Sequence, residues 1–474
     1  MTDSRALAKY GAVPSTENHT NVLEAGVGED ELYSTRERTL DVAQTKWTYF
    51  LLGCAILLPW SAMANATSFF LSRVAGSPIY PTFSSYWNTV YMSTKLICQF
   101  YCTFTSKQSS PSRRIIASII AMIFLVTSLC LSTFIRGTPS TFFAFSLLVG
   151  ALTAVAVGYL CTAVYAQAAL LGAPFLRAVF SGQAAAAVTI SVVQVASSMI
   201  ALWGSSQESD LAGAPGAGRN NQAEEIAARI FFGVAAIFLC ITLVTYTWLT
   251  RQPFDNPVSD ALQQHHGVGA PEELTPLLTE DRRNTSTVHN SYIYQVFRQN
   301  LIFMFSLAYV FVITLAVYPA ITARVQPVDP SIHPMLFTAV HFLVFNTGDL
   351  LGRCSCSFPR LILWSGETIL AMSLLRTLFI PLILFCNVDR PERIPTVLPI
   401  IHSDILFMII MLTIGYTNGY VSTLGITALS SLEHNPRLKG CRENVDVAAT
   451  LGGSFIIVGL TIGALSSFGV QAMI

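Results

Sequence analysis

The chain has 474 residues, of which 52% are hydrophobic and only 11% are charged, and its mean hydropathy is +0.54. Soluble domains carry about 25% charged residues, and a bilayer core requires about 20 apolar residues for each helical span. The composition therefore excludes an ordinary soluble domain and predicts an all-α polytopic membrane protein. The 27 basic and 27 acidic residues cancel, so the net charge gives no indication of a nucleic acid polymer as partner.

The ten cysteines give no sign of a metal site. They are scattered through apolar runs, and Cys354 and Cys356 are the closest pair in the sequence. No Cys-x-x-Cys pattern or His/Cys cluster is present. We interpret the cysteines as small, reduced core residues and expect neither a metal nor another cofactor.

The first half of the chain predicts six membrane spans after a polar tail. Residues 1–45 lack the pattern of a cleavable signal peptide, and the first span is expected over residues 47–71. Pro59 predicts a kink there, and Trp60 lies near mid-membrane depth. Because Trp usually lies at membrane interfaces, this central position favours cavity lining over plain helix packing. The other spans are expected at residues 82–106, 114–135, 140–171, 174–198 and 225–250.

Two polar residues stand out in these spans. Lys95 lies within the second span, where it either reaches toward the interface or pairs inside the protein. Gln183 is the polar exception in a fifth span rich in Gly, Ala and Ser, which let helices approach closely. A structural hydrogen bond between helices would explain Gln183 as well as a substrate contact does.

A change of composition separates the two halves. Gln, His, Pro, Glu, Arg and Ser dominate residues 251–295, which we interpret as a flexible cytoplasmic loop. This loop divides the membrane part into residues 46–250, with six spans, and residues 296–474, with five. The five later spans are expected at residues 297–324, 332–357, 361–387, 399–430 and 447–472, which makes eleven in all.

The stretch from His341 to Arg353 places four polar side chains inside a long apolar run. Asp349 and Arg353 are four residues apart, so on a helix they lie one above the other, and Asn346 joins the same stripe. Each charge at membrane depth costs roughly 2.5–3.5 kcal/mol on insertion scales. The stripe must therefore face the protein interior or a water-filled path. A buried ion pair that only fixes helix packing is the competing explanation.

The basic residues beside the predicted spans indicate an orientation. The side that holds the N-terminus carries more of them, for example Arg113, Arg114 and Arg251, than the other side, which carries Arg73 and Arg136. Because Lys and Arg concentrate on the cytoplasmic side, we expect a cytoplasmic N-terminus. An odd number of spans then places the C-terminus in a lumen or outside the cell.

Several motifs, in the same order, resemble the equilibrative nucleoside transporter family. FNTGDLLGR at 345–353 is similar to that family's signature Phe-Asn-x-x-Asp-x-x-Gly-Arg, and LLPW at 57–60 is similar to its first-helix motif. Ser61 and Ala184 depart from the family pattern, which has Asn and Gly at those positions. The remaining matches are SGQ at 181–183, TLAVYPAI at 314–321, RTLFIPLILFCN at 376–387 and TNGY at 417–420.

This resemblance implies a bundle similar to the major-facilitator fold, with two helical halves around a central cavity. It implies facilitative transport of nucleosides by alternating access, with nucleobases as further candidate substrates and no enzymatic activity. The partners would be these substrates and the lipid bilayer.

The resemblance also implies roles for individual residues. Trp60 would line the cavity against the base, while Asp349 and Arg353 would contact the ribose hydroxyls, with Asn346 and Gln183 in support. In the family, a Gln on the fourth helix often touches the base. That position is Cys161 here, which implies looser or different base recognition.

Three other readings compete with facilitative nucleoside transport. In a proton-coupled carrier, the proton could be carried by Asp349, Asp404, His341 or Glu367. The neighbouring Arg353 opposes protonation of Asp349, because a nearby cation favours the charged carboxylate. A membrane aspartyl protease would need Asp349 and Asp404 to face each other. A twelve-span sugar facilitator fits poorly, since the loop KQSSPSRR at 107–114 lacks that group's Gly-x-x-x-Asp-Arg pattern.

The central loop contains a candidate sorting signal. In PEELTPLLTED at 271–281, Glu273, Leu277 and Leu278 fit the acidic dileucine pattern. Cytosolic sorting adaptors could bind this loop as an extended peptide. The pattern favours a vacuolar or lysosomal membrane, with the plasma membrane as the alternative and an unrecognised linker as the competing explanation.

Overall fold

The computed structural model describes residues 29–80, 83–105, 111–135, 137–208, 217–251, 292–388 and 400–471. Its internal contacts divide the chain into residues 1–45 and residues 46–474. The predicted sorting residues Glu273, Leu277 and Leu278 lie outside the described residues, as do residues 252–291 of the predicted loop. Residues 1–28 of the predicted tail also lie outside them, and residues 29–45 belong to the first helix.

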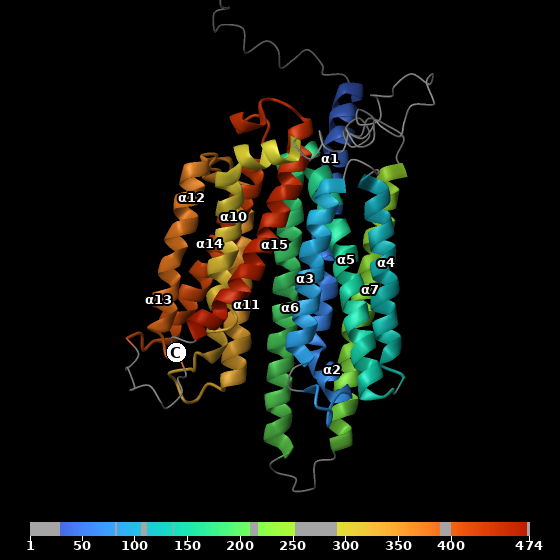
Figure 1. The fold of residues 1–474 in the computed structure, drawn as a ribbon, viewed down its shortest axis with the longest axis vertical. Helices are drawn as coiled ribbons and strands as arrows, with labels where there is room; N and C mark the ends of the chain where they lie inside the picture. Colours follow the sequence, from blue (N-terminus) through green and yellow to red (C-terminus); the bar gives the residue numbers. More distant parts are fainter. Residues whose placement is uncertain are drawn as a thin grey trace, which may run out of the picture. The chain divides into compact units, whose positions relative to one another are not determined.

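The regular structure of the described chain is helical, apart from one isolated bridge between Val325 and Val388 (Figure 1). The first half contains α1 (Glu29–Asn65), α2 (Thr67–Arg73), α3 (Phe83–Thr105), α4 (Pro111–Ser132), α5 (Pro139–Leu171), α6 (Ala173–Glu208) and α7 (Ala217–Arg251). The second half contains a helix over 292–299, then α10 (Leu301–Val317), α11 (Pro334–Ser355), α12 (Gly366–Leu375), α13 (Phe379–Leu384), α14 (Asp404–Leu429) and α15 (Glu443–Gln471).

Ten helical segments of the described chain are long and apolar enough to cross a membrane. Helix α3 is not one of them, although it has 23 residues, because Lys95, Gln99 and several Ser, Thr and Tyr residues lower its hydropathy. It still packs within the bundle, against α5 and α15. The all-helical membrane fold is confirmed, whereas the predicted count of eleven spans is not confirmed and depends on α3.

The helices of residues 46–474 form two groups (Figure 1). In the first group α5 packs against α3, α4 and α6, and α4 also packs against α7; in the second group α10, α12 and α14 pack against one another. Helix α15 packs against α10 and also against α5 and α3, and α11 packs against α14 and also against α6. Both α11 and α15 therefore connect the groups, and side chains on them can face helices of both halves.

Helices α11 and α14 approach closely because each presents glycines to the backbone of the other. A Cβ atom at Gly348 or Gly352 would lie within 3.0 Å of backbone atoms of α14, and one at Gly415 or Gly419 would do the same against α11. Within each helix the two glycines are four residues apart and therefore share one face. This contact fixes the side chains beside the glycines at short distances across the two helices.

The first predicted span, residues 47–71, breaks earlier than expected. Helix α1 continues through Pro59 and ends at Asn65, and Ala66 separates it from the short α2. The backbone of Ala66, with φ −85° and ψ 12°, is not helical. The interruption thus lies after Pro59 rather than at it, and Trp60 lies within the continuous helix.

The predicted span over residues 297–324 corresponds to a candidate span over Leu301–Arg324, but it is not one continuous helix. Helix α10 ends at Val317, and Tyr318 has the extended backbone (φ −109°, ψ 132°) that a residue before proline favours. Pro319 therefore terminates this helix. The change of direction places Tyr318 against Phe345 of α11, with ring centroids 4.0 Å apart.

Candidate functional site

A cavity of about 490 Å³ lies among helices of both groups. Its lining comes chiefly from α1, α3, α5, α6, α10, α11, α14 and α15. It brings together all six residues that the sequence suggested for substrate binding: Trp60, Cys161, Gln183, Asn346, Asp349 and Arg353.

The charged pair on α11 is buried and hydrogen-bonded. Arg353 Nε donates to Asp349 Oδ2 at 2.8 Å, and these side chains are only 8% and 7% exposed. Asn418 Nδ2 of α14 donates to Asp349 Oδ1 at 2.7 Å. Each carboxylate oxygen can accept two hydrogen bonds, so Asp349 retains capacity for a ligand hydroxyl. The pair is positioned by the protein before any ligand arrives.

A second buried cation is connected to this pair through neutral side chains. Arg376 Nη2 donates to Thr314 Oγ1 at 2.7 Å, and Thr314 Oγ1 donates to Asn418 Oδ1 at 2.8 Å. Arg376 is 2% exposed and also donates to the carbonyl of Ile414 at 3.1 Å. A polar chain therefore joins α10, α11 and α14 to Arg376, and its members Thr314 and Asn418 line the cavity themselves.

Sequence reasoning did not assign roles to Thr314, Asn418 or Arg376. Arg376 was visible as an intramembrane charge, which is a functional signal in itself. Its segment was predicted as one helix over 361–387, but a 3-10 turn over Arg376–Leu378 separates α12 from α13. Arg376 is the first residue of this turn, and from there its side chain donates to Thr314 of α10 and to the carbonyl of Ile414 in α14.

Polar contacts also join the two halves across α6 and α11. Arg353 Nη1 donates to the carbonyl of Phe180 at 3.0 Å, and Asn346 Nδ2 donates to Ser191 Oγ at 2.7 Å. Arg177 of α6 donates to the carbonyl of Cys356, just after α11. Arg353 therefore has one contact in each half of the protein.

Aromatic rings form much of the remaining lining. Tyr165 stacks on Phe180, with centroids 5.3 Å apart and planes 18° apart. Gln183 Nε2 donates to the Tyr165 hydroxyl at 2.8 Å, so Gln183 has the hydrogen bond between helices that the sequence left open. Trp60 is half-buried, and among the described residues its indole nitrogen has no hydrogen-bond partner. The cavity thus offers flat apolar faces beside a charged pair.

Helix α3 adds two polar side chains to the cavity that were not predicted for it. Lys95 and Gln99 both line it, near Cys161 and Tyr165 of α5. The sequence left open whether Lys95 reaches toward the interface or lies inside, and the structure places it at the cavity. Cys161 is buried at 2% exposure, so α5 contributes a thiol where α3 contributes an amide.

The other candidate proton carriers do not line this cavity. His341 is fully buried among Phe337, Phe342 and Phe407. Glu367 is exposed in the first turn of α12. None of the lining residues of the cavity is His341, Glu367 or Asp404.

Asp404 has a structural role at the start of α14. Its carboxylate accepts the backbone N–H groups of Val328 and Asp329 at 2.9–3.1 Å. Asn418, which contacts Asp349, lies fourteen residues further along the same helix, roughly 21 Å at the rise of an α-helix. The arrangement does not provide the facing aspartates of a membrane protease, and the described residues contain no group of His, Cys, Asp and Glu that could hold a metal.

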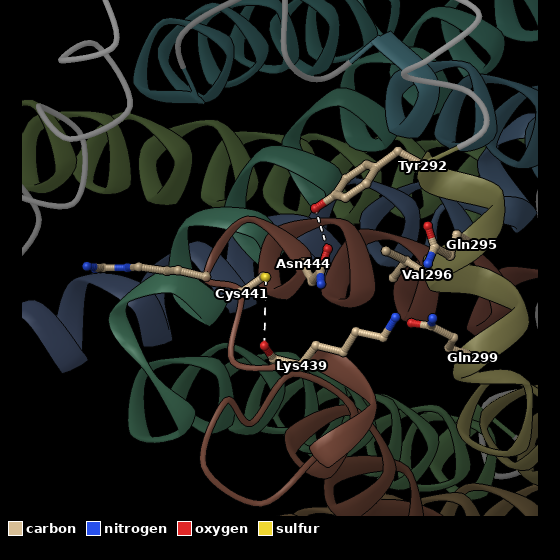
Figure 2. Close-up of a pocket in the computed structure, with 8 residues that line it drawn as sticks. Tyr292, Gln295, Val296, Gln299, Lys439, Cys441 and Asn444 are labelled. Carbon is tan, nitrogen blue, oxygen red and sulfur yellow. Dashed lines mark hydrogen bonds between the residues drawn. The ribbon is translucent and has the colours of Figure 1, made fainter.

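A second hollow, of about 600 Å³, is separate from the central cavity (Figure 2). It lies between the helix over 292–299 and the segment that leads into α15. The Tyr292 hydroxyl donates a hydrogen bond to Asn444 Oδ1 (Figure 2). In the same view the Lys439 side chain extends toward Gln299. The two hollows share no lining residue, and this one contains none of the predicted site residues.

The fold and the site can be compared with known proteins. The crystallised fucose:proton symporter FucP of E. coli matches with a TM-score of 0.51 and 14% identity, over 90% of this chain and 91% of that one. Equilibrative nucleoside transporter 1 of Homo sapiens is 24% identical over 93% of this chain and 100% of its own length. Equilibrative nucleoside transporter 2 of Rattus norvegicus is 25% identical over 90% and 96%.

The first likeness concerns the fold alone and confirms the expected major-facilitator architecture. The model of the nucleoside transporter family matches residues 147–472, which include α6, α11 and α14 with the buried pair. The resemblance inferred from the sequence motifs is thereby confirmed, and the protein is a transporter rather than an enzyme. The chain belongs to the nucleoside transporter family.

Proposed function

We propose that this protein carries nucleosides across a membrane by facilitative alternating access, and that the central cavity is the substrate site. The observation that carries the proposal is the Asp349–Arg353 pair, which lines a cavity shared by both halves of the bundle. The names of the equilibrative relatives support the same conclusion.

The chemistry of the pair suits a ribose. Vicinal hydroxyls both donate and accept hydrogen bonds, a carboxylate only accepts, and a guanidinium only donates. Asp349 can accept from one hydroxyl while Arg353 donates to the other. Asn346 and Gln183 support this arrangement through their contacts with Ser191 and Tyr165.

The aromatic lining suits a base. A purine or pyrimidine has a flat face on which an aromatic ring can stack, and Trp60 lies at the cavity with its indole N–H unpaired among the described residues. Free nucleobases could occupy the same part of the cavity without engaging the ribose pair. We therefore expect nucleosides to bind more tightly than nucleobases.

Passive transport is favoured over proton coupling by the surroundings of the carboxylates. Asp349 is the acidic residue of the cavity lining, and it is held by Arg353 and Asn418. Both donors bond the carboxylate oxygens directly, and none of the other candidate proton carriers, His341, Glu367 and Asp404, lines the cavity.

Uptake into liposomes that contain the purified protein tests the mode of transport. Labelled adenosine, uridine, adenine and uracil should enter until the inner and outer concentrations are equal, with or without a pH gradient. Accumulation of uridine above the outer concentration, driven by a proton gradient, would contradict passive transport.

Asp349→Asn tests the ribose contact. The variant should weaken nucleoside binding by about 10–100-fold, the range for hydrogen bonds to a charged group, and affect free nucleobases much less. Its thermal stability in detergent must be measured in parallel, because the pair is buried. Equal losses for adenosine and adenine in a well-folded variant would count against ribose contact.

We also propose that the protein resides in a vacuolar or lysosomal membrane, with residues 1–45 and 251–295 in the cytosol. The acidic dileucine pattern of Glu273, Leu277 and Leu278 supports the vacuolar or lysosomal membrane, and the distribution of basic residues supports the cytosolic placement of both segments. A fluorescent fusion should move to the cell surface when Leu277 and Leu278 are both replaced by Ala. A fusion that is already at the plasma membrane, or a double variant that stays on the vacuole, would show the sorting interpretation to be wrong.

A further inference from the structure

The α3 wall of the cavity carries polar groups that have no use in the function proposed above. Lys95 and Gln99 lie one helical turn apart, and both line the cavity. Gln99 is 1% exposed, and neither atom of its amide group has a hydrogen-bond partner among the described residues. Lys95 forms no ion pair with an acidic side chain of the same residues. A buried amide without partners in the wall of a cavity is a place where a ligand can supply the missing hydrogen bonds.

Gln99 lies beside α15, which packs against α3. Thr103, one turn further along α3, lies within hydrogen-bond distance of Ser454 (3.2 Å). The neighbouring Gly453 leaves room for the site, since a Cβ atom there would lie 3.2 Å from Gln99 Nε2 and 2.6 Å from the ring of Tyr165. Gln99 is therefore held in a slot between α15 and Tyr165.

The aromatic stack separates this slot from the ribose pair. Tyr165 lies on the Gln99 side and stacks on Phe180, with centroids 5.3 Å apart. The guanidinium of Arg353 lies 5.6 Å from the centre of the Phe180 ring. A nucleoside whose ribose engages Arg353 can extend past this stack and present its base edge to the α3 wall.

We propose that Lys95 and Gln99 read the base edge and select nucleosides with a keto group over those with an amino group at the equivalent position. This inference rests on the proposed function. Uracil, hypoxanthine and guanine present a carbonyl oxygen beside a ring N–H, whereas cytosine and adenine present an amino group. The ammonium group of Lys95 has donors only, so it matches the carbonyl and opposes the amino group. The amide oxygen of Gln99 can then accept from the adjacent ring N–H.

This assignment gives α3 the role that the fourth-helix Gln would have had. Cys161 on α5 is a weak hydrogen-bonding group and cannot read a base edge in this way. Lys95 and Gln99 line the same cavity as Cys161. Base recognition in this chain is thus displaced from α5 to α3 rather than lost.

Competition in proteoliposomes tests the inference with matched pairs of nucleosides. Uptake of labelled uridine is measured with unlabelled uridine or cytidine as the competitor. Uptake of labelled adenosine is measured with unlabelled inosine or adenosine as the competitor. The keto member of each pair should inhibit at a concentration at least about tenfold lower than the amino member does, which is the discrimination expected of one good base-edge contact. Lys95→Met and Gln99→Leu should each bring that ratio close to one. Ile97→Met, on the lipid-facing side of α3 at 70% exposure, should leave the ratio unchanged.

The outcomes separate this inference from the proposed function. If the wild-type protein takes up no nucleoside, the function itself is wrong. If it transports nucleosides but both members of each pair inhibit equally, the role of Lys95 and Gln99 is wrong while transport stands. A folded Lys95→Met protein that keeps the wild-type ratio would also overturn the inference. The wild-type ratio and Gln99→Leu decide the matter if Lys95→Met does not fold.

Discussion

The two polar walls of the central cavity differ in how their groups are satisfied. On α11, the side chains of Asp349 and Arg353 have protein partners from α14 and α6. On α3, the amide of Gln99 has no partner among the described residues, although it is as deeply buried. In the empty protein the charged groups of the α11 wall therefore have hydrogen-bond partners, whereas the Gln99 amide of the α3 wall has none among the described residues.

This difference separates two roles that a polar residue can have in a transporter. A buried polar atom without a partner costs about 1–3 kcal/mol, so Gln99 destabilises the empty protein while a satisfied group does not. Substitutions on the α11 wall should therefore lower stability and transport together. Substitutions on the α3 wall should change selectivity at little cost in stability.

The largest expected effect is on the α11 wall, for Arg353→Ala. The substitution leaves the Asp349 charge buried without its cation, and breaking a buried pair on one side typically costs about 3–5 kcal/mol. The melting temperature in detergent should fall sharply. Arg437→Ala, at an exposed arginine that donates to the carbonyl of Gln299, is the matched control and should have little effect. A melting temperature of Arg353→Ala equal to that of the control would show that the pair contributes nothing to stability.

A smaller loss is expected when the helices that carry this wall are forced apart. A Cβ atom at Gly419 would collide with the carbonyl oxygen of Asp349, so Gly419→Ala must shift α14 away from α11. Overpacking of this kind costs about 1–3 kcal/mol and should also weaken the Asn418–Asp349 hydrogen bond. Gly233→Ala on α7 is the control, because nothing lies within 4 Å of a Cβ atom there. Equal stability and transport in the two variants would mean that the close approach is not required.

The sequence predicts those features of the site that are local to one helix. Asp349, Arg353 and Asn346 share a stripe on one helix, so helical periodicity alone placed them together. Trp60 was recognised from its depth in a single apolar run. The spans were predictable for the same reason, since apolar length is a local property.

The partners of these residues depend on how distant helices cross. Asn418, Thr314 and Arg376 come from α14, α10 and the turn after α12, and only the folded chain brings them to Asp349. Helical periodicity does not report which helix packs against which. For Lys95 the two options left by the sequence differ only in what α3 faces, which again is a property of the bundle.

Trp60→Ala should affect binding more than stability. Trp60 is half-buried at the cavity, and stacking of a base on an aromatic ring is worth about 1–3 kcal/mol by alanine substitution. Adenosine, uridine, adenine and uracil should all bind more weakly, as measured by titration of the purified protein, because each has a base. Trp60→Phe keeps a ring and should retain most of the affinity. Unchanged affinity for all four compounds would assign Trp60 to helix packing.

The smallest effect on stability, and the sharpest test of the comparison, is expected from Gln99→Leu beside Asn418→Leu. Each substitution replaces a buried amide by an apolar side chain of similar size. Asn418 is bonded to Asp349 and Thr314, so its loss leaves two buried groups without that partner and should cost roughly 1.5–3 kcal/mol. Gln99 has no partner to lose among the described residues, so its replacement should leave the melting temperature of the empty protein unchanged or raise it. Thermal unfolding of both variants without ligand measures the difference directly. If Gln99→Leu destabilises the protein as much as Asn418→Leu does, then Gln99 is already satisfied in the empty protein, and the two walls do not differ in the way described.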